Sequence, residues 1–222
     1  MLLPQATHNA SFAGQINLRT ISGARGAATD KVKELMITSE LDATKPYIFE
    51  IPNVLSAAEC RNWIARIQSL GTEAATINSA RGAEVDSQIR NNRRLIIDDD
   101  EWAGILFERV RESVPPAIHE MSLAGVNERL RCYEYEVGHR FAPHSDGVFV
   151  RTEKERSCYT YMIYLNEEFE GGETRFFVEP EVVIKPKTGS SLFFQHPIIH
   201  EGSQVLAGVK YVLRTDLIYR LL

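Results

Sequence analysis

The sequence predicts an α+β protein in which a mainly β core, of the β-sandwich or jelly-roll type, follows a set of supporting helices. Two observations lead to this prediction. Helical spacing of apolar residues is confined to two segments before about residue 116. After about residue 128 the chain becomes a series of short β-branched and aromatic runs separated by Gly, Pro, Asn and Asp. Helices first and many short strands afterwards favour a helical layer packed on a sandwich.

The first predicted helix begins after Ser56. The segment Ser-Ala-Ala-Glu is a capping box, in which the Ser56 side chain caps the helix and Glu59 reaches back to the cap. Gly71 ends the helix. The apolar residues that follow at helical spacing are Cys60, Trp63, Ile64, Ile67 and Leu70.

A second helix is predicted to begin near Asp99 or Asp100 and to end before Pro115 and Pro116, because proline cannot continue a helix. Residues 77–94, which lie between the helices, are polar and irregular and predict a loop. The side chains that we expect this helix to bury are Trp102, Ile105, Leu106 and Val110.

The chain divides into a lead-in over residues 1–45 and a domain over residues 46–222. Within the domain we expect helical support over 46–127 and a catalytic β core over 128–222. The predicted strands of this core are RLRCYEYEVG (129–138), SCYTYMIYLN (157–166), ETRFFVE (173–179), SSLFFQH (190–196) and KYVLRTDLIY (210–219).

Composition sets the broad class of the protein. With 222 residues and 44% hydrophobic content the chain can bury a full core. A formal net charge of −5 gives no reason to expect nucleic acid as a partner. The N-terminal residues lack a basic start, and no apolar run reaches membrane-spanning length. We therefore expect a cytoplasmic protein with no membrane partner, either a monomer or a homodimer.

The most informative residues are His144, Asp146 and His200. They form His-x-Asp followed by a distant histidine, which is the pattern of the facial triad of non-haem Fe(II) oxygenases. Residues i and i+2 of an extended strand point the same way, so His144 and Asp146 can bind one ion together. A hydrogen-bonded turn is the alternative interpretation of this pair. Pro143 and Gly147 bracket the pair at a strand end, which favours the metal site.

Lys210 and Arg214 form a second group, because alternation puts both on the same face of one predicted strand. One interpretation is a pair of solvated cations on an edge strand. The other is a buried cation that binds the carboxylate of a cosubstrate. His196 lies close to His200 and is a weaker candidate ligand.

Four segments together resemble the catalytic domain of prolyl 4-hydroxylase-like Fe(II)/2-oxoglutarate dioxygenases, and the upstream segments NVLSAAECRNWI and RNNRRLIIDDDEWA also resemble the bacterial branch of that family. The four segments are RLRCYEYEVGHRFAPHSDG, YLNEEFEGGETRFF, IKPKTGSSLFF and HEGSQVLAGVKYVLRTD, and they span about residues 128–220. The resemblance implies a double-stranded β-helix, a cupin-like relative of the jelly roll, with helices bracing one sheet.

The resemblance also implies roles for individual residues. His144, Asp146 and His200 would hold Fe(II), with 2-oxoglutarate and O2 as cosubstrates and ascorbate as an optional reductant. Lys210 stands where this branch binds the C5 carboxylate of 2-oxoglutarate, and Arg214 is the alternative. Asp146 argues against halogenation, because halogenating relatives have a small residue in its place. The residues expected to line the cosubstrate pocket are Tyr135, Tyr164 and Thr174.

The substrate is the least determined feature. The resemblance suggests a prolyl residue in a peptide or protein. The alternatives are a free amino acid or another small molecule and, more remotely, a cupin-like metal-binding protein that is not an oxygenase. Asn92, Arg93 and Arg151 lie in predicted mouth loops and are candidate substrate contacts.

Overall fold

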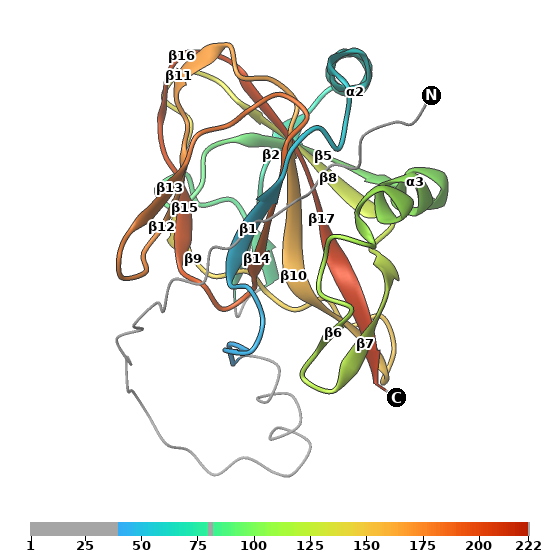
Figure 1. The fold of residues 1–222 in the computed structure, drawn as a ribbon. Helices are drawn as coiled ribbons and strands as arrows, with labels where there is room; N and C mark the ends of the chain where they lie inside the picture. The colour runs from blue at the N-terminus through green and yellow to red at the C-terminus, as the bar shows by residue number, and fades with distance from the viewer. Residues whose placement is uncertain (1–39, 80–81, 222) are drawn as a thin grey trace, which may run out of the picture.

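The computed structural model describes residues 40–79 and 82–221 as two facing β-sheets with two helices on the outer side of the larger sheet (Figure 1). This is the predicted jelly-roll architecture. Most of the predicted lead-in over residues 1–45 lies outside the described residues.

The larger sheet has nine strands in the order β1-β14-β10-β17-β8-β5-β2, with β7 paired to β17 and β6 to β7. Its central strands are the long β10 and β17, which pair antiparallel. The nine strands are β1 (Ile48–Ile51), β2 (Glu73–Ala74), β5 (Arg93–Asp98), β6 (Ala117–Ile118), β7 (Met121–Val126), β8 (Arg129–Tyr135), β10 (Glu155–Tyr164), β14 (Ser191–Gln195) and β17 (Lys210–Leu221).

The smaller sheet has four strands in the order β13-β12-β15-β9 and lies beside the larger one (Figure 1). Its strands are β9 (Phe141–His144), β12 (Thr174–Phe176), β13 (Val182–Ile184) and β15 (His200–Gly202). Two short pairs complete the described strands: β11 (Phe169–Gly171) with β16 (Val205–Gly208), and β3 (Ile77–Ser79) with β4 (Gly82–Glu84).

Strand alternation divides the core into two layers. On β17, Tyr211, Leu213 and Leu217 belong to the cluster packed against the helices, whereas Val212 belongs to the cluster between the sheets. Successive side chains of a strand point to opposite faces. Lys210 and Arg214 therefore point, like Val212, toward the space between the sheets.

The helices form as predicted. Helix α2 (Ala57–Leu70) has the Ser56–Glu59 capping box and ends at Gly71. Helix α3 (Asp100–Val110) is capped by Asp99. The buried side chains are Cys60, Trp63 and Ile67 on α2 and Ala103, Leu106 and Val110 on α3. Trp102 and Ile105 on α3, which were expected to be buried, are only partly buried, and Leu70 at the end of α2 is 59% exposed.

The structure differs from the prediction between the helices and in the supporting region. Residues 77–94 contain the β3–β4 hairpin and the start of β5 rather than loop alone. Strands β1, β5 and β7 come from the region expected to be helical support and join the larger sheet. The polar pattern of 77–94 does not reveal these strands, because edge strands with one exposed face carry many polar residues.

Within the described residues, no helix has the length and apolar character needed to cross a membrane.

Candidate active site

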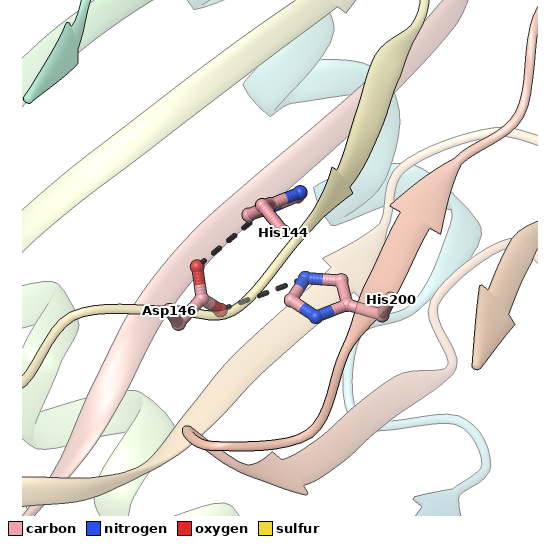
Figure 2. A group of neighbouring side chains, drawn as sticks. All are labelled: His144, Asp146 and His200. Carbon is pink, nitrogen blue, oxygen red and sulfur yellow. Dashed lines mark ion pairs between the residues drawn. The ribbon is translucent and has the colours of Figure 1, made fainter. Parts of the chain in front are cut away.

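His144, Asp146 and His200 converge between the two sheets (Figure 2). His144 ends β9 and His200 begins β15, and the two residues are direct partners in the pairing of these strands. Asp146 follows two residues after β9. One ligand atom from each residue lies within 4.8 Å of the others. The Asp146 carboxylate oxygens are 3.8 Å from His144 Nε2 and 3.7 Å from His200 Nε2.

Both histidines are oriented by the backbone. His144 Nδ1 lies 2.8 Å from the carbonyl oxygen of Ala142, and His200 Nδ1 lies 3.0 Å from that of Ile198. A carbonyl can only accept, so Nδ1 carries the proton on each ring and Nε2 keeps its lone pair for a metal.

The charge states suit ligation. Burial lowers the pKa of His144 to about 3, and burial also lowers the pKa of His200, so both rings are neutral at pH 7. Burial is the largest single influence on the pKa of Asp146 and would raise it, but Arg214 and the neighbouring histidines together outweigh burial and keep the carboxylate ionised. Two neutral imidazoles and one carboxylate are the donor set that suits Fe(II) with open coordination positions, so the residues fit this metal.

Arg214 forms an ion pair with Asp146. Its Nη2 lies 3.1 Å from Asp146 Oδ1 and 3.4 Å from Asp216 Oδ1. Asp216 also accepts from Arg131 at 3.1 Å. Burial is the largest single influence on the pKa of Arg214 and would lower it, but Asp146, Tyr133 and Asp216 together raise it above its usual value. The guanidinium is therefore one member of a buried charge network around the triad carboxylate.

Lys210 lies in the same pocket without an ion pair to any described residue. The side chain is 2% exposed, and its Nζ donates to the carbonyl of Gly172 at 2.6 Å. Its amine also lies 5.1 Å from the ring centre of Tyr135. Burial lowers the pKa of Lys210 to about 7, and the nearby Glu173 opposes this only in part. The buried amine lacks the carboxylate that would satisfy it.

The predicted cosubstrate residues gather around this amine. Tyr135 and Thr174 line the pocket together with Lys210. Tyr164 is not among the residues that line the pocket. Its hydroxyl lies 2.7 Å from Thr174 Oγ1, and its ring centre is 5.6 Å from Lys210 Nζ. The full lining consists of Tyr133, Tyr135, Phe141, His144, Asp146, Met162, Thr174, His200, Gly202, Lys210, Val212 and Arg214.

The three predicted substrate contacts do not come to this pocket. Asn92 is buried, and its side chain accepts from Arg90 and donates to the backbone of Arg93. The exposed side chain of Arg93, on β5, donates a hydrogen bond to the hydroxyl of Thr72. Arg151 pairs with Glu128 and lines a different surface hollow. Polar residues in predicted loops were expected at the mouth, but here they support the scaffold.

Sequence reasoning missed Tyr133 and undervalued Arg90. The guanidinium of Arg90 lies between the rings of Tyr133 and Phe141, 4.5 Å and 4.3 Å from their centres. Burial would raise the pKa of Tyr133, but nearby arginines, Arg90 first and Arg214 next, lower it to about 8. Alternation could have placed Tyr133 beside Tyr135 on the inner face, whereas the burial of Arg90 depends on long-range packing.

Comparison with known proteins adds two similarities in sequence. A sequence model of the 2OG-Fe(II) oxygenase superfamily matches residues 130–215. A protein named probable prolyl 4-hydroxylase 8 from Arabidopsis thaliana is 28% identical over 145 residues, which cover 62% of this chain and 47% of that protein. The chain thus spans about half of that relative.

Solved structures share the fold. The viral collagen prolyl hydroxylase of Paramecium Bursaria Chlorella virus-1, solved with 2OG, has a TM-score of 0.56 at 21% identity, covering 79% of this chain and 97% of that one. A prolyl hydroxylase from Trichoplax adhaerens, solved with a hypoxia inducible factor peptide fragment, has a TM-score of 0.58 at 18% identity, covering 88% and 94%. The predicted double-stranded β-helix is therefore confirmed.

Proposed function

Because residues 130–215 match the sequence model of the 2OG-Fe(II) oxygenase superfamily, we propose that the protein hydroxylates a prolyl residue of a peptide or protein. We also propose that the chain is a dioxygenase that uses Fe(II), 2-oxoglutarate and O2. The prolyl substrate and the roles of individual residues are our inference.

The proposal rests on two features of one pocket, a set of metal-ligand atoms and a buried amine, which a single cosubstrate could connect. Three ligand atoms converge at one side, and a buried amine without a carboxylate partner lies at the other. A dicarboxylate that also binds metal joins the two. A cupin-like protein that only binds metal would leave Lys210 buried with no carboxylate to meet.

Each residue then has a definite task. His144, Asp146 and His200 hold the iron, and Lys210 binds the distal carboxylate of 2-oxoglutarate. Tyr135 and Thr174 shape the walls between them. When bound, the iron supplies the activation of O2 that couples decarboxylation of 2-oxoglutarate, to succinate and CO2, with hydroxylation of the substrate. The protein contributes orientation and a pocket that excludes bulk water.

Support for the prolyl substrate comes from the relatives. The Arabidopsis protein is named as a prolyl 4-hydroxylase, and the Trichoplax enzyme was solved with a peptide fragment. These names describe those proteins, and they make peptidyl proline the first substrate to test here.

A small molecule that bears a carboxylate is the second candidate, because positive charge lies beside the pocket. Arg90 is 4% exposed, and its Nη2 has no hydrogen-bond partner among the described residues. Arg90 and Arg214 act together on Tyr133, which lines the pocket. A free amino acid would bring an anion to this cluster, whereas an internal prolyl residue would not.

The test is a substrate screen with the full chain, Fe(II), 2-oxoglutarate, O2 and ascorbate as a proposed reductant. Proline-containing peptides and free amino acids are compared for succinate formation coupled to a gain of one oxygen in the product. We expect coupled turnover with peptides. Coupled turnover with free amino acids alone would replace the first candidate by the second.

Two controls make the screen decisive. Asp146→Ala should abolish turnover with every substrate, since it removes a ligand. Failure of the wild-type protein to bind 2-oxoglutarate in the presence of metal would overturn both candidates.

A further inference from the structure

A buried chain of hydrogen bonds connects the Asp146 carboxylate to the segment after β9. Thr160 Oγ1 donates to Asp146 Oδ2 at 2.5 Å and lies 3.0 Å from His196 Nδ1. His196 Nε2 lies 2.7 Å from Ser157 Oγ, which accepts from the backbone N–H of Phe149 at 2.8 Å. Thr160, His196 and Ser157 are each 0–1% exposed, so water does not compete for these contacts.

The donors and acceptors fix the direction of the hydrogen bonds between Asp146 and His196. Thr160 has a single hydroxyl proton, and an ionised carboxylate can only accept, so that proton goes to Asp146. Thr160 Oγ1 must then accept from His196 Nδ1–H. At the other end of the ring, His196 Nε2 is hydrogen-bonded to Ser157 Oγ. The chain of bonds therefore requires a proton on Nδ1 of His196.

Both carboxylate oxygens of Asp146 are held by neighbouring side chains. Oδ2 accepts from Thr160 and Oδ1 from Arg214. The backbone of Asp146 is held as well, because its N–H donates to the carbonyl of His196 at 3.1 Å. The carboxylate cannot rotate without breaking a buried hydrogen bond.

We propose that His196 is a positioning residue for the metal centre, which acts through Thr160 to hold the Asp146 carboxylate in the orientation that binds iron. His196 is thus an orienting residue rather than a fourth ligand, and both of its ring nitrogens are already occupied by hydroxyl groups. This inference rests on the proposed function, since it assumes that Asp146 is a ligand.

Loss of an orienting partner should weaken metal binding more than it weakens the fold. Groups that hydrogen-bond to metal ligands change metal affinity by about 10- to 100-fold when they are removed. A role that only satisfies buried polar atoms would lower stability and leave metal affinity unchanged. Metal affinity, measured without turnover, therefore separates the two roles.

The experiment compares two threonines on adjacent strands of the larger sheet. Thr160→Val removes the hydroxyl that contacts Asp146. Thr215→Val is the matched control, because Thr215 is 1% exposed and its hydroxyl donates to the carbonyl of Asn127 at 2.6 Å, in a bond that does not involve the triad. The readouts are the Kd for Co(II), the visible absorption bands of bound Co(II), and the thermal midpoint without metal.

We expect Thr160→Val to weaken Co(II) binding by about 10- to 100-fold and to shift the absorption bands. Thr215→Val should lower the thermal midpoint and leave the Kd and the bands unchanged. Thr160→Ser, which restores the hydroxyl, should recover the wild-type Kd. Equal Co(II) affinity in Thr160→Val and Thr215→Val would overturn the proposal.

His196 is tested by a conservative pair. His196→Asn keeps an amide N–H near the position of Nδ1, and His196→Phe keeps the ring without a donor. We expect His196→Phe to lower Co(II) affinity and His196→Asn to recover most of it. If both variants bind Co(II) as the wild type does, His196 has no positioning role. Should His196→Phe not fold, His196→Leu, which also lacks a donor, is measured in its place with the same expected result.

Failure of the inference is distinguishable from failure of the proposed function. Wild-type protein that binds Co(II) and 2-oxoglutarate, together with an unaffected Thr160→Val, would reject only the positioning role. Wild-type protein that does not bind Co(II) would reject the metal site itself.

Discussion

Arg214 Nη2 and Asp146 Oδ1 lie 3.1 Å apart, so the guanidinium that could have bound a cosubstrate is already paired with a triad carboxylate. Lys210, four residues earlier on the same face of β17, forms no ion pair with a carboxylate of the described residues. The two cations that the sequence left as alternatives therefore have different surroundings. This contrast supports Lys210 as the residue that binds the C5 carboxylate.

The first prediction separates these two cations. Lys210→Met keeps the length of the side chain and removes its charge, so the KM for 2-oxoglutarate should rise about 10- to 150-fold, the equivalent of a charged hydrogen bond of about 1.5–3 kcal/mol. Arg214→Lys should instead weaken metal binding and leave that KM near the wild-type value. Titrations of metal and of 2-oxoglutarate in both variants test this, and the reverse pattern would exchange the two roles.

The second prediction concerns metal and stability. A ligand that binds only the folded state stabilises it, by about 2.7 kcal/mol at 100 times its Kd. Mn(II) or Co(II) should therefore raise the thermal midpoint of the wild-type protein. Asp146→Asn should fold but show no such rise, because the amide is a poor replacement for an ionised ligand. A metal-dependent rise of wild-type size in Asp146→Asn would show that the ion binds elsewhere.

The third prediction is a pH dependence of cosubstrate binding. Burial places the pKa of Lys210 at about 7, below its usual value, and a bound carboxylate would raise it again. Below pH 7 the amine is already protonated and binds the dianion directly. Above pH 7 binding must take up a proton, so the affinity for 2-oxoglutarate should fall as pH rises through this range.

Isothermal calorimetry in two buffers of different ionisation enthalpy measures this proton uptake. The control is Lys210→Met, whose weaker binding should show no proton uptake in the same range. Uptake that persists in Lys210→Met would assign the titration to another group.

The fourth prediction uses two glycines with similar φ values. Gly71 and Gly172 have φ values of 76° and 68°, in the region that favours glycine. A Cβ on Gly71 would meet nothing within 4 Å, whereas one on Gly172 would lie 2.9 Å from Phe169 Cε2 and 3.3 Å from Lys210 Cδ. Gly71→Ala should cost about 1–3 kcal/mol of stability, because Gly71, with φ 76° and ψ 156°, lies in a region that only glycine adopts readily.

Gly172→Ala should cost more than Gly71→Ala and should also raise the KM for 2-oxoglutarate, because it displaces Lys210. Chemical denaturation and steady-state kinetics measure the two effects. Equal losses of stability with an unchanged KM would mean that Phe169 and Lys210 move aside freely.

The fold was predictable where the signal is local. The α2 capping box depends on four neighbouring residues, and the long strands β10 and β17 carry strong β-branched and aromatic composition. Strands β1, β5 and β7 were missed because their pairing depends on partners far along the chain. Ile48, for example, pairs with Phe194. No short window of sequence contains that information.

The residues of the site were predictable, but most of their contacts with one another were not. His144, Asp146 and His200 follow from their spacing, and strand alternation places Lys210 and Arg214 on one face. Their different partners do not follow, because Asp146 and Gly172 reach β17 only through the packing of the two sheets. Asn92 illustrates the opposite error, since polarity alone does not distinguish a mouth residue from a buried support.

Strand β17 also sets the order in which the domain can acquire its chemistry. It follows all other described elements in the sequence, pairs with β10, β8 and β7, and contributes both Lys210 and Arg214. During synthesis the larger sheet lacks this central strand until the ribosome has passed residue 221. A nascent chain can thus contain all three triad residues and still lack both Lys210 and Arg214.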